Sequence, residues 1–116
     1  VHLTECGYVG HSDLAPYYAN ADLLVFPSSA EAAPLVPLEA MACGTNLVVS
    51  DIPPHREVCE GLAFFAPLEP AGLARTIQEA LGHRHPSGIL RDRALQYSWP
   101  RTARIYADIY REIGAL

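Results

Sequence analysis

The sequence predicts an α/β fold, built as a parallel sheet with flanking helices. Short apolar runs alternate with segments of helical periodicity, which is the order of elements expected in such a fold. The clearest runs are continuously apolar, as in strands that are covered on both faces. Hydrophobic residues make up 50% of the 116 residues, which suits a packed core, and the length allows one domain at most, spanning 1–116.

Four segments have the composition of strands. The expected strands are Val1–Cys6, Asp22–Pro27, Asn46–Ser50 and Leu62–Ala66. The first is weakly apolar. The segment Asp51–Pro54 should close the third strand as a loop, because two adjacent prolines are unsuited to a strand interior.

Five helices are expected between and after these strands. They run from a cap at Ser12 or Asp13 to about Asn20, within Glu31–Cys43, from Pro70 to Gly82, over Ile89–Tyr97, and from a cap at Ser98 through Ile113. Pro34 and Pro37 are acceptable in the second helix only within its first turn, and Gly44 is a suitable residue to end it.

Composition and charge exclude several classes of function. The net charge is −5 and the eight Lys and Arg residues are scattered, whereas nucleic-acid binding requires a basic face. No apolar run approaches the ~20 residues needed to cross a bilayer. The three cysteines form no CxxC pair, which favours reduced thiols and a cytoplasmic location.

Histidine-containing segments are weak candidates for a site. His83 and His85 have no third metal ligand at a recognisable spacing, so no metal site is predicted. The segment His55–Glu57 follows an expected strand and is a candidate to face a ligand cleft. A structural role for Glu57 is the stronger interpretation.

The region from Ser28 to Glu39 is where ligand chemistry is expected. Ligands of parallel α/β sheets bind outside the carboxyl ends of the strands, and Ser28–Ala33 leads from such an end into a helix N-terminus, which attracts phosphate. Glu31 precedes the helix and Glu39 lies inside it, so the two carboxylates can flank one ligand and accept hydrogen bonds from vicinal hydroxyls. From spacing alone, a solvated helix residue is the stronger interpretation of Glu39, because paired glutamates are common.

This segment resembles the donor-site signature of the glycosyl transferases group 1 family. The signature is a Glu, seven residues and a second Glu, and here it reads E-AAPLVPL-E followed by AMACGTNLVVSD. The resemblance extends in order through GYVGHSDLAPYYANADLLVFPS, IPPHREV and YSWPRTARIYADIYREI. It implies a Rossmann-like fold, as part of the C-terminal, nucleotide-sugar-binding domain of a GT-B enzyme.

The resemblance also implies roles for individual residues. Glu39 matches the glutamate that holds the ribose hydroxyls of a nucleotide sugar. Glu31 matches the glutamate beside the donor sugar at the reaction centre and is the candidate catalytic residue. Backbone groups of Ala33, Leu35 and Val36 would approach the sugar and the distal phosphate. Main-chain groups of Tyr8 and Val9 would meet the nucleobase.

The implied activity is transfer of a sugar from a nucleoside diphosphate sugar to a hydroxyl acceptor, with retention and without a metal or other cofactor. By the same resemblance, the acceptor-binding N-terminal domain and two strands lie outside this sequence. We therefore expect that the chain is a segment of a longer protein. Alternatively, it depends on a partner chain or self-associates through an exposed sheet edge. Ala32 and Pro34 stand where many members have glycine, so a non-catalytic remnant or interaction module of the same fold is the alternative.

Overall fold

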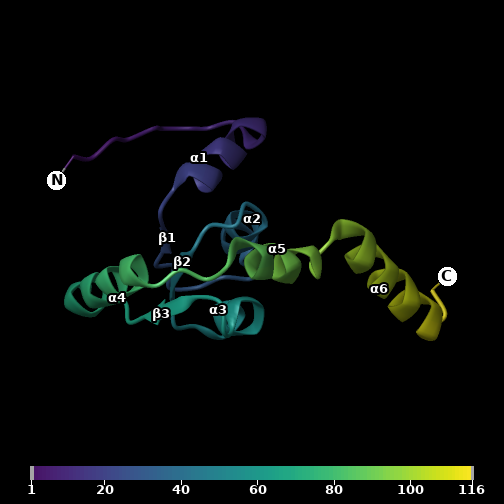
Figure 1. The fold of residues 1–116 in the computed structure, drawn as a ribbon. Coiled ribbons are helices and arrows are strands. Elements are labelled where there is room, and N and C mark those ends of the chain that lie inside the picture. Colours follow the sequence, from purple (N-terminus) through teal and green to yellow (C-terminus); the bar gives the residue numbers. More distant parts are fainter. Residues whose placement is uncertain (1, 116) are drawn as a thin grey trace.

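The computed structural model describes residues 2–115 and confirms the α/β class. Its sheet contains β1 (Leu24–Phe26), β2 (Leu47–Ser50) and β3 (Phe64–Ala66). The strands are parallel and lie in the order β1-β2-β3 (Figure 1), with Val25 opposite Val48 and Val49 opposite Phe65. The three strands lie within the expected segments Asp22–Pro27, Asn46–Ser50 and Leu62–Ala66.

Helices precede, connect and follow these strands. They are α1 (Leu14–Asn20), α2 (Leu35–Ala42), α3 (Pro53–Cys59), α4 (Pro70–Gly82), α5 (Ser87–Leu95) and α6 (Trp99–Glu112), with a 3-10 turn, η1 (His11–Asp13), before α1. Five of the six correspond to the helices that the sequence predicts. The helix α1 begins after Asp13 as expected, although the Asp13 side chain makes no capping hydrogen bond.

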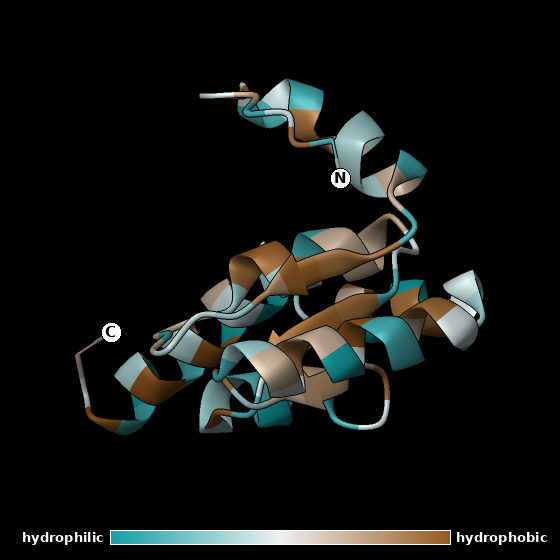
Figure 2. Ribbon diagram, turned by 90° about the vertical axis from the view of Figure 1, so that its left-hand side faces the viewer, coloured by the Kyte–Doolittle hydropathy of each residue, from teal (hydrophilic) through white to brown (hydrophobic). Residues whose placement is uncertain are grey.

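The central strand β2 separates two groups of packed side chains. Leu47 and Val49 belong to a core cluster with residues of α2, α3 and α5, whereas Val48 packs with residues of β3 and α4. Figure 2 shows the strands as mainly hydrophobic ribbons between helices. Every residue of β2 is buried, as a continuously apolar strand requires, while β1 at the sheet edge is half-buried.

The two prolines of α2 lie where a helix tolerates them. Pro34 is the N-cap residue and Pro37 is in the first turn, so neither removes a hydrogen bond from the helix interior. After α2 the chain reverses at Gly44, whose φ is +78° and whose N–H donates to the Met41 carbonyl at 2.9 Å. This left-handed conformation is the reason for glycine at this position.

The expected strand Val1–Cys6 is wrong for residues 2–6, and Val1 lies outside the described residues. The chain from His2 to Gly10 has no regular structure and runs away from the sheet (Figure 1). A strand forms only beside a partner strand that satisfies its backbone groups, and β1, β2 and β3 provide none there. Self-association through an exposed sheet edge stays a prediction.

The expected loop Asp51–Pro54 is a second error, because the helix α3 begins at Pro53. The two prolines occupy the first positions of α3, where a missing N–H leaves nothing unsatisfied. The sequence predicts only that these prolines end the strand, whereas in the structure they also begin the helix that carries His55, Arg56 and Glu57.

The last helix α6 extends away from the sheet (Figure 1). Its start is capped as predicted, with the Ser98 Oγ accepting a hydrogen bond from the Arg101 N–H. Its isoleucine side chains stay about half exposed, Ile105 at 49% and Ile109 at 47%. Within the part of the chain that the structure describes, no helix combines the length and apolarity needed to cross a membrane.

Candidate functional site

A groove of about 1120 Å³ runs along one side of the molecule between α2, α3, α5 and the start of α6. The Ala32–Leu35 segment and Glu39 line its α2 side. Glu57 on α3 and Arg91 on α5 line it as well, together with the aromatic side chains of Tyr97 and Trp99. The groove therefore begins where β1 leads into α2, which is the carboxyl edge of the sheet.

Glu39 lies in the second turn of α2 and is half-buried. The Tyr18 hydroxyl, from the end of α1, donates a hydrogen bond of 3.0 Å to the Glu39 Oε2. Burial raises the pKa of Tyr18 to about 12, and the hydrogen bond to Glu39 adds to this effect. The phenol is thus uncharged at neutral pH and acts as a donor that fixes the carboxylate.

The N-terminus of α2 offers few backbone donors to a ligand. The first N–H groups of a helix have no partner within the helix, but Pro34 and Pro37 have no N–H at all. The Leu35 N–H already donates to the Ala33 carbonyl at 2.9 Å. The Val36 N–H is consequently the one donor among these four positions that has no partner in the described chain.

The structure brings some of the predicted site residues together. Glu39, Ala33 and Leu35 line the groove, with Val36 in the same turn of α2. The described lining does not include Glu31, Tyr8 or Val9. The Tyr8 side chain is 95% exposed, in the extended N-terminal segment.

Ala32 fits this loop without backbone strain. Among the described residues, positive φ angles occur only at glycines, so the loop before α2 does not require glycine here. Ala32 lies in the groove wall, where its methyl group occupies space that a glycine would leave open.

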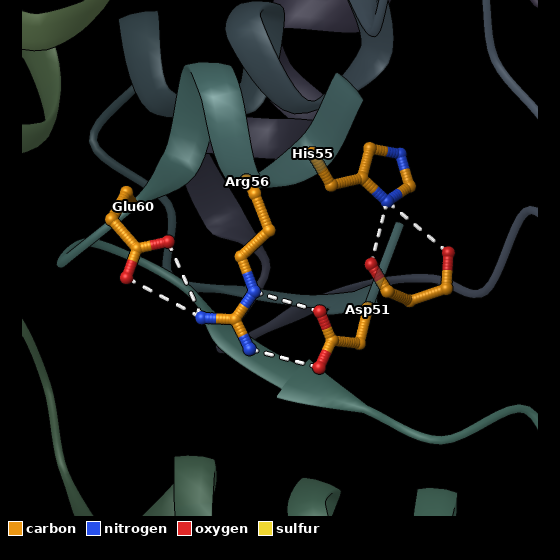
Figure 3. A network of polar contacts seen from close by, with 5 residues as sticks. Asp51, His55, Arg56 and Glu60 are labelled. Carbon is orange, nitrogen blue, oxygen red and sulfur yellow. Dashed lines mark hydrogen bonds and ion pairs between the residues drawn. The ribbon is translucent and has the colours of Figure 1, made fainter. Parts of the chain in front are cut away.

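A buried polar network ties the loop after β1 to β2 and α3. The Ser50 Oγ donates to the Ser28 carbonyl, and the His55 Nδ1 lies 2.9 Å from the Ser50 carbonyl and 3.1 Å from the Ser50 Oγ (Figure 3). Because a carbonyl only accepts, the proton must be on the His55 Nδ1. His55 is fully buried, and its Nε2 has no hydrogen-bond partner among the described residues.

Arg56, next to His55, makes ion pairs and a ring contact on the exposed side of α3. Its guanidinium pairs with Asp51 and Glu60 (Figure 3) and lies 3.8 Å from the centre of the Phe65 ring. The hydrogen bond from Arg56 lowers the pKa of Asp51 below its usual value. Of the candidate segment His55–Glu57, only Glu57 lines the groove, while His55 and Arg56 make structural contacts.

Sequence reasoning missed the contact of Tyr18 with Glu39. The spacing of tyrosines along α1 is typical of packing, and Tyr18 does pack against the main core cluster. No local pattern links α1 to a carboxylate 21 positions further along the chain. The signal lies in the packing of α1 against α2, which only the fold reveals.

These features define a Rossmann-like parallel α/β domain with a groove at the carboxyl edge of its sheet. The sequence pattern described as "Glycosyl transferases group 1" matches residues 2–83. This match covers more than half of the chain, and the chain belongs to that family.

Similar proteins include a D-inositol 3-phosphate glycosyltransferase from Paenarthrobacter aurescens, 32% identical over 86% of this chain and 26% of that protein. A serotype-specific mannosyltransferase from Escherichia coli is 34% identical over 88% of this chain and 13% of that protein. The chain spans about a quarter of the length of the D-inositol 3-phosphate glycosyltransferase.

A solved structure supports the same relationship. Sucrose-phosphate synthase from Thermosynechococcus elongatus superposes with a TM-score of 0.84 at 32% identity, over 97% of this chain and 30% of that one. The predicted Rossmann-like fold and the resemblance to the family are thereby confirmed.

Proposed function

We propose that the chain forms part of the donor-binding region of a glycosyltransferase and holds a nucleoside diphosphate sugar in the groove beside α2. The observation that carries the proposal is Glu39. It is a carboxylate fixed by Tyr18, facing a groove at the carboxyl edge of a parallel sheet, in a chain of this family. Similar proteins are described as transferases of a mannosyl or other glycosyl group.

The proposed chemistry is transfer of the sugar to a hydroxyl acceptor, with retention of configuration. Glu39 accepts hydrogen bonds from the vicinal ribose hydroxyls, a geometry that suits a carboxylate. Glu31 is assigned to the donor sugar, and Tyr8 and Val9 to the nucleobase, by resemblance to the family.

The diphosphate is assigned to the N-terminus of α2, where the Val36 N–H and the helix dipole favour an anion. Protein groups of this kind stabilise the leaving diphosphate electrostatically, and the proposal includes no metal or other cofactor. Arg91 is the one Lys or Arg side chain in the described groove lining, and further cations and the acceptor site are assigned to chain outside 1–116.

We place this activity in the cytoplasm. The observation in support is that Cys6, Cys43 and Cys59 are all free thiols. Burial raises the pKa of Cys59 to about 11, so this thiol is protonated and unreactive in the folded chain. Thiols in this state are typical of a reducing compartment.

A second candidate is a non-catalytic module of the same fold. The observation in its favour is the first turn of α2, where two prolines and the bond from Leu35 to Ala33 leave the Val36 N–H as the single free donor. Such a helix end would hold a diphosphate weakly. This module would keep the fold of residues 2–115 without measurable affinity for nucleotides.

Titration calorimetry separates the two proposals. The complete encoded polypeptide that contains residues 1–116 is titrated with UDP, GDP and ADP and with their sugar conjugates. We expect saturable binding of one base series. The variant Glu39→Ala should weaken it roughly 10- to 150-fold, which corresponds to the ~1.5–3 kcal/mol typical of hydrogen bonds to a charged group.

Glu79→Ala is the matched control, because it removes an exposed carboxylate of α4 that lies outside the groove lining. Its affinity should stay within about twofold of wild type. Equal losses in the two variants would contradict the role of Glu39. Circular dichroism checks that each protein is folded, and a folded wild type that binds no nucleotide would favour the non-catalytic module.

A further inference from the structure

Tyr18 is held to the α2 region by both its side chain and its main chain. Its hydroxyl donates to the Glu39 Oε2 at 3.0 Å, and its carbonyl accepts a hydrogen bond of 2.6 Å from the Thr45 Oγ1. Thr45 follows α2 and is only 4% exposed, so it is a rigid anchor. The position of the Tyr18 hydroxyl relative to α2 is therefore well defined.

Tyr18 itself does not belong to the groove lining within residues 2–115. It packs against the core cluster and reaches the groove only through its bond to Glu39. A residue in this position acts on a ligand indirectly. It restricts the orientation of the Glu39 carboxylate, which faces the groove.

We propose that Tyr18 is a positioning residue that holds the Glu39 carboxylate ready for the two ribose hydroxyls of the donor nucleotide. The inference rests on the proposed function, in which Glu39 binds that ribose. Neither the family match nor the similar proteins assign a role to Tyr18.

The hydrogen-bonding capacity of the carboxylate allows this arrangement. An ionised carboxylate has two oxygens with about four acceptor sites, and Tyr18 occupies one of them on the Oε2. Both hydroxyls of a ribose can still donate to the remaining sites. The bond from Tyr18 also removes side-chain freedom from Glu39 before the ligand arrives, so less entropy is lost on binding.

The variant Tyr18→Phe tests the proposal, because it removes the hydroxyl and keeps the ring in the core. With the nucleoside diphosphate that the protein binds best, we expect affinity to fall about three- to tenfold, the effect of freeing one side chain. Tyr17→Phe, at an exposed position of the same helix, is the matched control and should bind as wild type does. Thermal unfolding of each variant shows that the fold persists.

Two further measurements distinguish positioning from a general structural effect. In the Glu39→Ala background, Tyr18→Phe should cause no additional loss, because the carboxylate that it orients is gone. With the corresponding 2′-deoxynucleotide, which offers Glu39 one hydroxyl fewer, the loss caused by Tyr18→Phe should shrink. A purely structural role would give the same loss in both backgrounds and with both nucleotides, and would overturn the proposal.

The remaining outcomes separate this inference from the proposed function. If Glu39→Ala weakens binding but Tyr18→Phe behaves as Tyr17→Phe does, only the role of Tyr18 fails. If Glu39→Ala leaves binding unchanged, or a folded wild type binds no nucleotide, the assignment of Glu39 fails and the role of Tyr18 fails with it.

Discussion

Replacing Leu90 by alanine is expected to lower the free energy of unfolding by about 2–5 kcal/mol, the range for a buried leucine whose removal leaves a cavity. Leu90 is on α5, is fully buried, and belongs to the core cluster that also contains Met41 of α2. The pair α2 and α5 has the most extensive contact between elements, and it forms two walls of the groove. The loss should therefore loosen the site as well as the core.

Urea denaturation followed by circular dichroism measures this effect. Leu95→Ala is the matched control, because Leu95 lies on the same helix but is 76% exposed. Its free energy of unfolding should change by less than about 0.5 kcal/mol, as is usual for surface positions. Similar losses in the two variants would show that α5 is not packed against α2 in solution.

The variant Gly44→Ala is expected to cost about 2–5 kcal/mol. A left-handed backbone at an alanine costs about 1–2 kcal/mol, and overpacking about 1–3 kcal/mol more. The φ of Gly44 is +78°, and a Cβ there would lie 2.8 Å from the Ser87 Cβ and 3.1 Å from the Arg91 Nη2. Because Ser87 and Arg91 belong to α5, the added methyl group should displace α5 from the end of α2.

Two further glycine variants are controls for the backbone and packing contributions to this cost. Gly61→Ala has a similar φ of +77° with no atom near the new Cβ, so it measures the backbone contribution alone. Gly88→Ala, within α5 and in open space, should be neutral or slightly stabilising, since alanine is the better helix former. A Gly44→Ala loss no larger than that of Gly61→Ala would contradict the close approach of α5 to Gly44.

Most of the fold could be predicted from local patterns, because most of its elements depend on residues that are close together in the sequence. The apolar run of β2, the cap at Ser98 and the turn at Gly44 are each determined within a few positions. The strand predicted within Val1–Cys6 is absent from residues 2–6, because a strand also requires a neighbouring strand. The helix α3 was missed because Pro53 and Pro54 either break or begin a helix, depending on the direction in which the chain continues.

The candidate site was predictable as a location but not as a set of contacts. The glutamate spacing and the carboxyl edge of the sheet identified α2, and the groove lies there. The role of Tyr18 could not be predicted, because its bond to Glu39 depends on how α1 lies against α2. The network of Ser28, Ser50 and His55 likewise joins three segments whose proximity follows from the parallel sheet.

The central claim is that a nucleotide binds in the groove at the start of α2. Hydrogen–deuterium exchange with mass spectrometry tests it most directly, comparing the complete encoded polypeptide without and with a saturating nucleoside diphosphate sugar. We predict slower exchange in peptides covering residues 31–42, and no change in peptides of α4, on the opposite face of the sheet. Protection that falls on α4 instead, or no protection of residues 31–42, would contradict the account.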